Sequence, residues 1–67
     1  MKITISKFPD ANGNEAWQVF IPGIPLCKET TKTIAESLAR NLLLQEKGNE
    51  LWFWDGFTKT ETLLKGN

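Results

Sequence analysis

The chain contains a single cysteine, Cys27, and no histidine. One cysteine cannot form a disulfide within the chain, and a structural zinc site needs several cysteine or histidine ligands. A chain of 67 residues buries only about 60% of its unfolded surface, and such a core rarely contributes more than ~3–5 kcal/mol. We therefore expect one small domain, residues 1–67, without metal or cofactor. Close packing or self-association must stabilise it, and a homodimer is the simplest such assembly.

The charges of the chain balance, with eight lysine and arginine residues and eight aspartate and glutamate residues. Nucleic-acid-binding domains usually carry a basic excess or a basic patch, and the lysines here are scattered. The composition therefore argues against nucleic acid as the main partner. The N-terminus lacks the apolar core of a signal peptide, and no apolar run approaches the ~20 residues of a membrane span. We expect a cytoplasmic protein without membrane contact.

Two segments near the N-terminus alternate between apolar and polar residues, which is the pattern of half-buried β-strands. Ile3 and Ile5 share one side of residues 2–8, and Trp17 and Val19 share one side of residues 16–21. The intervening residues 9–14, PDANGN, form a dense turn signal. Together these features predict a β-hairpin.

The hairpin is followed by a proline-rich junction. Pro22 and Pro25 cannot donate backbone hydrogen bonds to a sheet, so they are expected to end the hairpin and redirect the chain. Residues 26–28 could add a short edge strand. Within them, Cys27 is expected to pack inward as a small apolar residue.

A helix is predicted from residue 34 to residue 47. Thr33 and Glu36 have the spacing of a capping box at its start, and Gly48 suits the left-handed conformation that ends a helix. Its apolar stripe should pack on the sheet, and consists of Ile34, Ala35, Leu38, Ala39 and Leu42. Leu44 lies off this stripe. It is either simply exposed or in contact with another chain.

The C-terminal third predicts a second hairpin. Residues 50–54, ELWFW, are rich in strand-forming aromatic residues, and Asp55-Gly56 is a two-residue turn signal. Such a turn pairs Trp54 with Phe57 and Trp52 with Lys59. The tail from Thr58 to Leu64 then continues as a strand, although the spacing of Thr58 and Glu61 also suits a short helix.

The predicted fold class is α+β, with an antiparallel sheet and one helix packed on a face, in the order ββ(β)αββ. Catalysis is not expected from such a chain. The commonest general base is missing without histidine, Cys27 has no imidazole partner, and the carboxylates are dispersed. We therefore assign no catalytic residue and predict that the protein is not an enzyme.

The aromatic residues of the second hairpin are the main candidates for a binding surface. Aromatic side chains dominate cores and protein interfaces, and they can also stack on single-stranded bases. They could be covered within the domain or a symmetric dimer, contact a different protein, or bind bases. The candidate interface residues are Trp52, Trp54, Phe57 and Leu44.

The segment from Pro22 to Asn41, PGIPLCKETTKTIAESLARN, resembles the signature of the HicB-like antitoxin family. In that signature two prolines and a cysteine precede a polar stretch, and Thr-x-x-Glu opens a helix. The matching residues are Pro22, Pro25, Cys27, Thr33 and Glu36. Gly23 and Leu26 stand where the family usually has aspartate and glycine. The hairpin before this segment also resembles the family's first strands.

The resemblance implies a strand-strand-strand-helix-strand domain similar to part of a ribonuclease H fold, without its catalytic carboxylates. Such domains bind and block a small HicA-like toxin that cleaves RNA, and they form dimers or tetramers. The expected function is therefore that of a small non-catalytic protein-binding domain, and both a HicA-like toxin partner and the loss of any toxin partner stay open. Two alternatives stay open: a self-assembling accessory protein, and a binder of single-stranded nucleic acid through Trp52 or Trp54.

Overall fold

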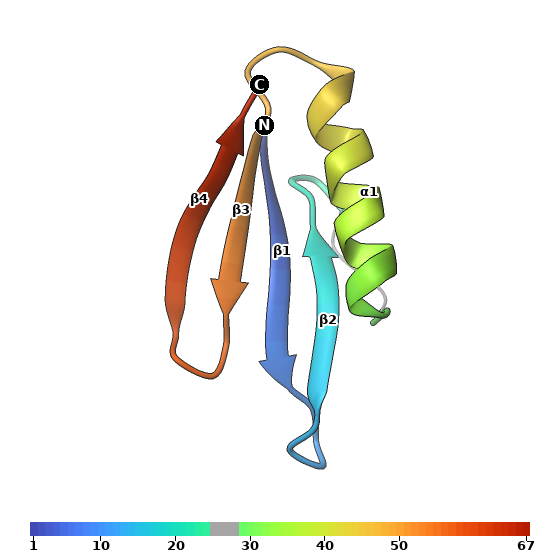
Figure 1. The fold of residues 1–67 in the computed structure, drawn as a ribbon, viewed down its shortest axis with the longest axis vertical. Coiled ribbons are helices and arrows are strands. Elements are labelled where there is room, and N and C mark those ends of the chain that lie inside the picture. Colours follow the sequence, from blue (N-terminus) through green and yellow to red (C-terminus); the bar gives the residue numbers. More distant parts are fainter. Residues whose placement is uncertain (25–28) are drawn as a thin grey trace.

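The structure is a computed structural model that describes residues 1–24 and 29–67. Its described part forms a four-stranded sheet in the order β2-β1-β3-β4, with one helix beside it (Figure 1). The elements are β1 (Lys2–Pro9), β2 (Glu15–Phe20), α1 (Lys32–Gln45), β3 (Glu50–Asp55) and β4 (Thr60–Gly66). The predicted α+β fold with one helix on a sheet face is confirmed.

The N-terminal hairpin forms as predicted. β1 and β2 are antiparallel, with Ile5 opposite Val19. The carboxylate of Asp10 holds the turn, because its Oδ1 accepts hydrogen bonds from the backbone N–H groups of Asn12 and Asn14 at 2.8 and 2.9 Å. This is the local side-chain bonding that makes aspartate a turn residue.

The hairpin ladder ends at Phe20, and a β-turn follows. The backbone N–H of Ile24 donates to the carbonyl of Ile21 at 3.2 Å, and Gly23 has φ +84°. Proline at the second position and a glycine with positive φ at the third are the requirements of a type II turn, which Pro22 and Gly23 meet. The predicted short strand at 26–28, with Pro25 and Cys27, lies outside the described residues.

Helix α1 begins two residues earlier than predicted. Its N-cap is Thr31, an extended residue whose hydroxyl accepts the backbone N–H of Ile34 at 3.2 Å. The prediction that Thr33 is the N-cap is therefore wrong, and Thr33 lies within the first helical turn. The start is set by Thr30, whose N–H donates to the carbonyl of Trp17 at 2.8 Å and keeps the chain extended up to Thr31.

The helix also ends earlier than predicted, at Gln45 instead of residue 47. Gly48 does adopt a left-handed conformation with φ +89°. However, the carbonyl groups at the end of the helix accept hydrogen bonds from two asparagine side chains. Asn49 Nδ2 donates to the carbonyl of Leu42 at 2.9 Å, and Asn67 Nδ2 donates to those of Leu43 and Glu46 at 2.7 and 2.9 Å. The carbonyls that a helix leaves unpaired at its end are satisfied in this way.

The buried stripe of α1 is displaced from the prediction toward Leu43. Ala35, Ala39 and Leu43 are buried, whereas Ile34 and Leu38 are 57% and 45% exposed. The inclusion of Ile34 and Leu38 in the sheet-facing stripe is therefore wrong. The face of α1 that packs on the sheet is centred on the two alanines, whose side chains are short. The longer side chains of Ile34 and Leu38 lie to one side of this face and remain exposed to solvent.

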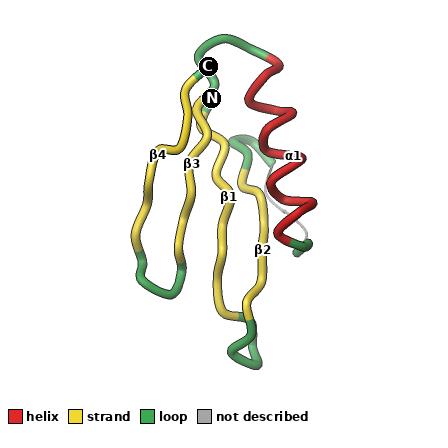
Figure 2. The backbone as a smooth tube through the Cα atoms, viewed as in Figure 1, coloured by secondary structure: helices red, strands yellow, loops and turns green. Residues whose placement is uncertain are grey.

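The sheet is mixed and not fully antiparallel, because β1 and β3 are parallel. Helix α1 returns the chain to the end of the sheet where β1 begins, and both chain ends lie near the start of β3 (Figure 1). The backbone N–H of Glu50 there donates to the carbonyl of Met1 at 2.8 Å. Figure 2 shows the two hairpins side by side, with β1 and β3 in the centre.

The tail forms strand β4, which confirms the preferred alternative, but the predicted two-residue turn is wrong. Trp54 pairs with Glu61 and Trp52 with Leu63, not with Phe57 and Lys59. Gly56 lies in the longer turn between β3 and β4, where it also approaches β1. Its N–H donates to the carbonyl of Lys7 at 2.6 Å, and a Cβ there would lie 2.9 Å from that oxygen.

The hydrophobic core lies between α1 and one face of the sheet. Its buried members are Ile3, Ile5, Trp17, Val19, Ala35, Ala39, Leu43 and Leu51. The ring of Phe53 packs against that of Trp17, with 6.0 Å between the centroids. Among residues 1–24 and 29–67, no helix combines the length and the apolar character that a membrane span requires.

Candidate functional site

In the described part of the chain, five large apolar side chains lie on the face of the sheet away from α1. Residues alternate between the two faces of a strand, so the neighbours of the core residues point to this open side. We call these five residues the open-face patch: Phe8, Phe20, Trp52, Trp54 and Leu63. Phe20 and Leu63 are 48% and 49% exposed, and both tryptophans are half-buried.

The strand register aligns the patch into rows. Phe20, Thr4, Trp52 and Leu63 are neighbours across all four strands. Gln18, Ser6, Trp54 and Glu61 form the next row. Ser6 is only 2% exposed although it points to the open side, so larger side chains of this face cover it.

The charged groups of this face largely neutralise one another. The ammonium group of Lys2 lies 4.5 Å from the centroid of the Trp52 ring and forms an ion pair with Glu61. The carboxylate of Glu50 is 3.5 Å from the indole nitrogen of Trp52. Cation–π contacts and exposed ion pairs are worth about 1 kcal/mol or less each. The middle of the face therefore combines Trp52 and Trp54 of β3 with Thr4 and Ser6 of β1, and one cation and two carboxylates lie around Trp52.

The helix side of the sheet has a second surface lined by apolar residues, of which Leu44 and Leu64 are exposed and four belong to the buried core. Helix α1 lies over β1 and β2 and has fewer contacts with β3. Beside the helix lie two adjoining hollows of about 340 and 260 Å³ that share Arg40, Leu51 and Leu64. We call this surface the helix-side groove. Its apolar lining consists of Ile5, Trp17, Leu43, Leu44, Leu51, Phe53 and Leu64.

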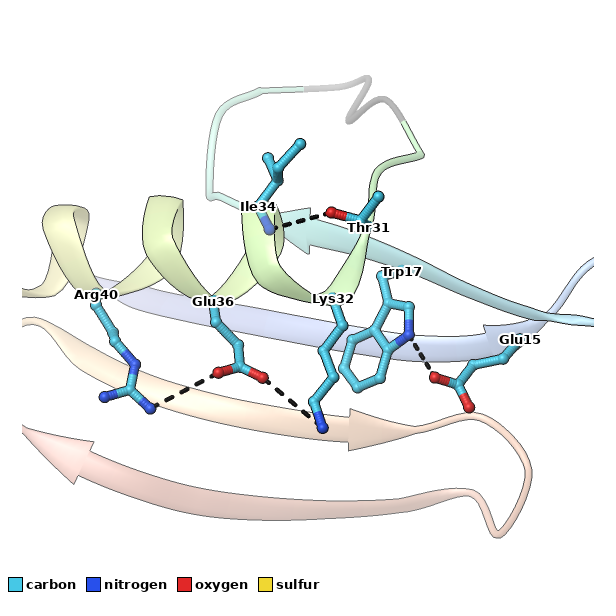
Figure 3. A network of polar contacts seen from close by, with 7 residues as sticks. All are labelled: Glu15, Trp17, Thr31, Lys32, Ile34, Glu36 and Arg40. Carbon is cyan, nitrogen blue, oxygen red and sulfur yellow. Dashed lines mark hydrogen bonds and ion pairs between the residues drawn. The ribbon is translucent and has the colours of Figure 1, made fainter.

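Three charged side chains of α1 form one wall of the helix-side groove. Figure 3 shows Lys32, Glu36 and Arg40 extending from the helix over the sheet. Glu36 lies 4.0 Å from Lys32 and 3.9 Å from Arg40, at the i,i+4 spacing of helical ion pairs. The prediction that Glu36 caps the helix is wrong, because it lies beyond the first turn. Lys65 lines the groove near its other side.

The four candidate interface residues do not form one surface. Trp52 and Trp54 lie together in the open-face patch. Leu44 is 69% exposed and lines the helix-side groove. Phe57 lies in the β3–β4 turn, where the ammonium group of Lys7 is 5.4 Å from its ring centroid.

The sequence did not identify three members of the open-face patch as candidate interface residues: Phe8, Phe20 and Leu63. Alternation along β2 does place Phe20 on the other face of the sheet from Trp17 and Val19. The signal that joins Phe20 to Trp52 is the pairing of both with Thr4, and this pairing requires β1 to lie between β2 and β3. Among the described residues, no three carboxylates lie close enough together to hold a metal ion.

Comparisons of the chain with known protein families, with characterised proteins and with solved structures find no match.

Proposed function

We propose that this protein is a small non-catalytic protein-binding domain of the HicB-like type. One observation carries the proposal: the helix covers only part of one side of the sheet, so large apolar side chains lie at the surface on both sides. Exposed apolar patches of this kind mark sites of protein–protein contact.

The helix-side groove is the surface that we assign to a different protein. Its floor of Leu51, Phe53 and Leu64 is apolar, and the charged side chains of α1 stand beside it. An apolar centre with a polar rim is the usual anatomy of an interface. The described order has two strands before the helix and two after it, and it shares with the order that the resemblance implies the opening strands, the helix and the strand that follows. The third strand that the resemblance implies before the helix would fall outside the described residues. A HicA-like RNA-cleaving toxin is accordingly the proposed partner.

The test mixes the purified protein with a small HicA-like protein encoded next to it and measures RNA cleavage and the mass of the complex. We expect a defined complex and suppressed cleavage. Leu64→Lys, which places a charge in the groove, should weaken the complex at least tenfold. Asn41→Lys adds the same charge on an exposed part of α1 and should leave binding unchanged. Full cleavage with no complex would contradict the proposal.

A second candidate function is the binding of single-stranded nucleic acid. Trp52 and Trp54 lie on one open sheet face at alternate positions of β3, where bases could stack on their rings. The charges favour the first proposal, because Lys2 beside Trp52 is already paired with Glu61. Quenching of tryptophan emission by an oligonucleotide at low salt, abolished in Trp52→Ala, would support this candidate. Unchanged emission would exclude it.

A further inference from the structure

The open-face patch is a surface that matches a second copy of itself. Its row across the whole sheet, from Phe20 on β2 to Leu63 on β4, is apolar except at Thr4 on β1. Trp54 and Phe8 extend the patch along the strands. A flat face of this kind is what two β-sheets present to each other in a sandwich, about 10 Å apart. A single domain leaves this face in water.

We propose that a second copy of this chain packs on the open-face patch, sheet against sheet, to form a two-fold dimer with the helices outside. The inference goes beyond the proposed toxin binding, because it concerns the opposite face of the sheet. It leaves the helix-side groove of each copy free for a different protein.

The size of the face suits a small dimer. Strands spaced ~4.8 Å apart, with about six residues at ~3.3 Å each, give four strands a face of roughly 19 by 20 Å. Specific interfaces bury about 600–1,000 Å² of accessible surface per partner. The flat outline of this face is roughly 380 Å², and its accessible surface is larger because side chains project from it. The core of one copy is thin, with eight buried residues in its main cluster among residues 1–24 and 29–67. Small domains of this kind commonly use oligomerisation for stability.

The charges of the face allow a copy of itself to approach. Lys2 and Glu61 form a neutral pair over Trp52, so most of the face carries no net charge. Glu50 lies at the end of the sheet, in the first position of β3. Two such faces meet without a block of like charges at the centre, whereas a strongly charged partner would find no opposite charge there.

Pairing through the edges of the sheet is less favourable than packing through its face. On β4, Glu61 and Lys65 are charged and the register with β3 is irregular at Leu51 and Trp52. Charges and bulges on an edge strand oppose the addition of another strand. On β2, Thr30 already occupies the position beside Trp17.

The experiment measures the mass of the protein in solution by light scattering over a range of concentrations, for the unchanged chain and three variants. Phe20→Lys and Leu63→Lys place a charge in the patch, and Leu44→Lys places it on the helix side. All three positions are about half exposed or more, so each variant should fold, which circular dichroism checks. We expect the unchanged chain to have twice the 7.6 kDa mass of one chain. Phe20→Lys and Leu63→Lys should each raise the dissociation constant of the dimer at least tenfold, and Leu44→Lys should leave it unchanged.

Two results would overturn the inference. One is a mass of 7.6 kDa at every concentration. The other is a dimer that Leu44→Lys dissociates and Leu63→Lys does not, which would place the interface on the helix side. Toxin binding is measured separately. A monomer that suppresses RNA cleavage would contradict the dimer and support the proposed function. A dimer that does not suppress RNA cleavage would support the dimer and contradict the proposed function.

Discussion

At the scale of single residues, short polar side chains at the two ends of α1 determine where the helix starts and stops. Thr31 accepts one free N–H at the start, and Asn49 and Asn67 donate to three carbonyls at the end. Asn49 is only 1% exposed and also accepts a hydrogen bond from the N-terminal amine of Met1 at 3.0 Å. These contacts join the helix end to both ends of the chain.

The N-cap assignment predicts different effects for two neighbouring threonines. Thr31→Ala removes the side-chain acceptor and should lower the free energy of unfolding by about 0.5–2 kcal/mol. Thr33→Ala, within the first turn, should change it by less than about 0.5 kcal/mol, because alanine is the better helix former. Urea denaturation of both variants measures the difference. A larger loss of unfolding free energy in Thr33→Ala than in Thr31→Ala would contradict this assignment and indicate a helix that starts at residue 34.

The buried amide of Asn49 should be worth more than an exposed asparagine. Asn49→Ala leaves the Leu42 carbonyl and the N-terminal amine without this partner, and we expect a loss of about 1–3 kcal/mol in unfolding free energy. Asn41→Ala, at an exposed position of α1, is the control and should have little effect. Equal denaturation midpoints for the two variants would contradict this account of the helix end.

At the scale of the elements, alternation and turn chemistry in the sequence were sufficient to predict the strands, and their exact pairing was not. Ile3, Ile5, Trp17 and Val19 mark the first hairpin directly. The parallel pairing of β1 with β3 depends on where α1 delivers the chain, which no local pattern contains. Gly56 does lie in the β3–β4 turn, but that turn is longer than predicted, and the close approach of Gly56 to Lys7 is a contact between distant segments that no local pattern contains.

The start of α1 and the choice of its buried face also depend on contacts between distant segments. Three closely spaced threonines, at 30, 31 and 33, can each start a helix, and only the bond from the N–H of Thr30 to the Trp17 carbonyl selects Thr31. The periodicity indicated an apolar stripe, but Ile34, Leu38 and Leu43 are equally apolar. Which flank is buried depends on the position of α1 over β1 and β2. The open-face patch was partly predicted through Trp52 and Trp54, and its full extent needs the register of all four strands.

The displaced stripe leads to a prediction about two leucines of α1. Leu43 is 3% exposed and Leu38 is 45% exposed. Leu43→Ala should cost about 2–5 kcal/mol of unfolding free energy, as for other buried leucines, whereas Leu38→Ala should cost roughly 1 kcal/mol or less. Thermal or urea unfolding of the two variants compares them. The reverse order of stability would show that the stripe faces the sheet through Leu38.

At the scale of the whole molecule, the helix layer is too narrow for the sheet. One helix covers the β1–β2 half of one side, which leaves the helix-side groove on that side and the open-face patch on the other. A dimer formed through the patches would bury Trp52 and Trp54 and leave both grooves outside. The protein would then present two equal sites to a partner, in agreement with the role proposed for it.

Contacts between two copies can be measured directly by NMR on a mixture of isotope-labelled and unlabelled chains. If the open-face patch is the dimer interface, intermolecular NOEs should connect Trp52, Trp54, Phe20 and Leu63 with the same residues of the other copy, and Leu44 should show none. NOEs that involve Leu44 or Leu64 instead, or no intermolecular NOE at a concentration where the mass doubles, would contradict the account.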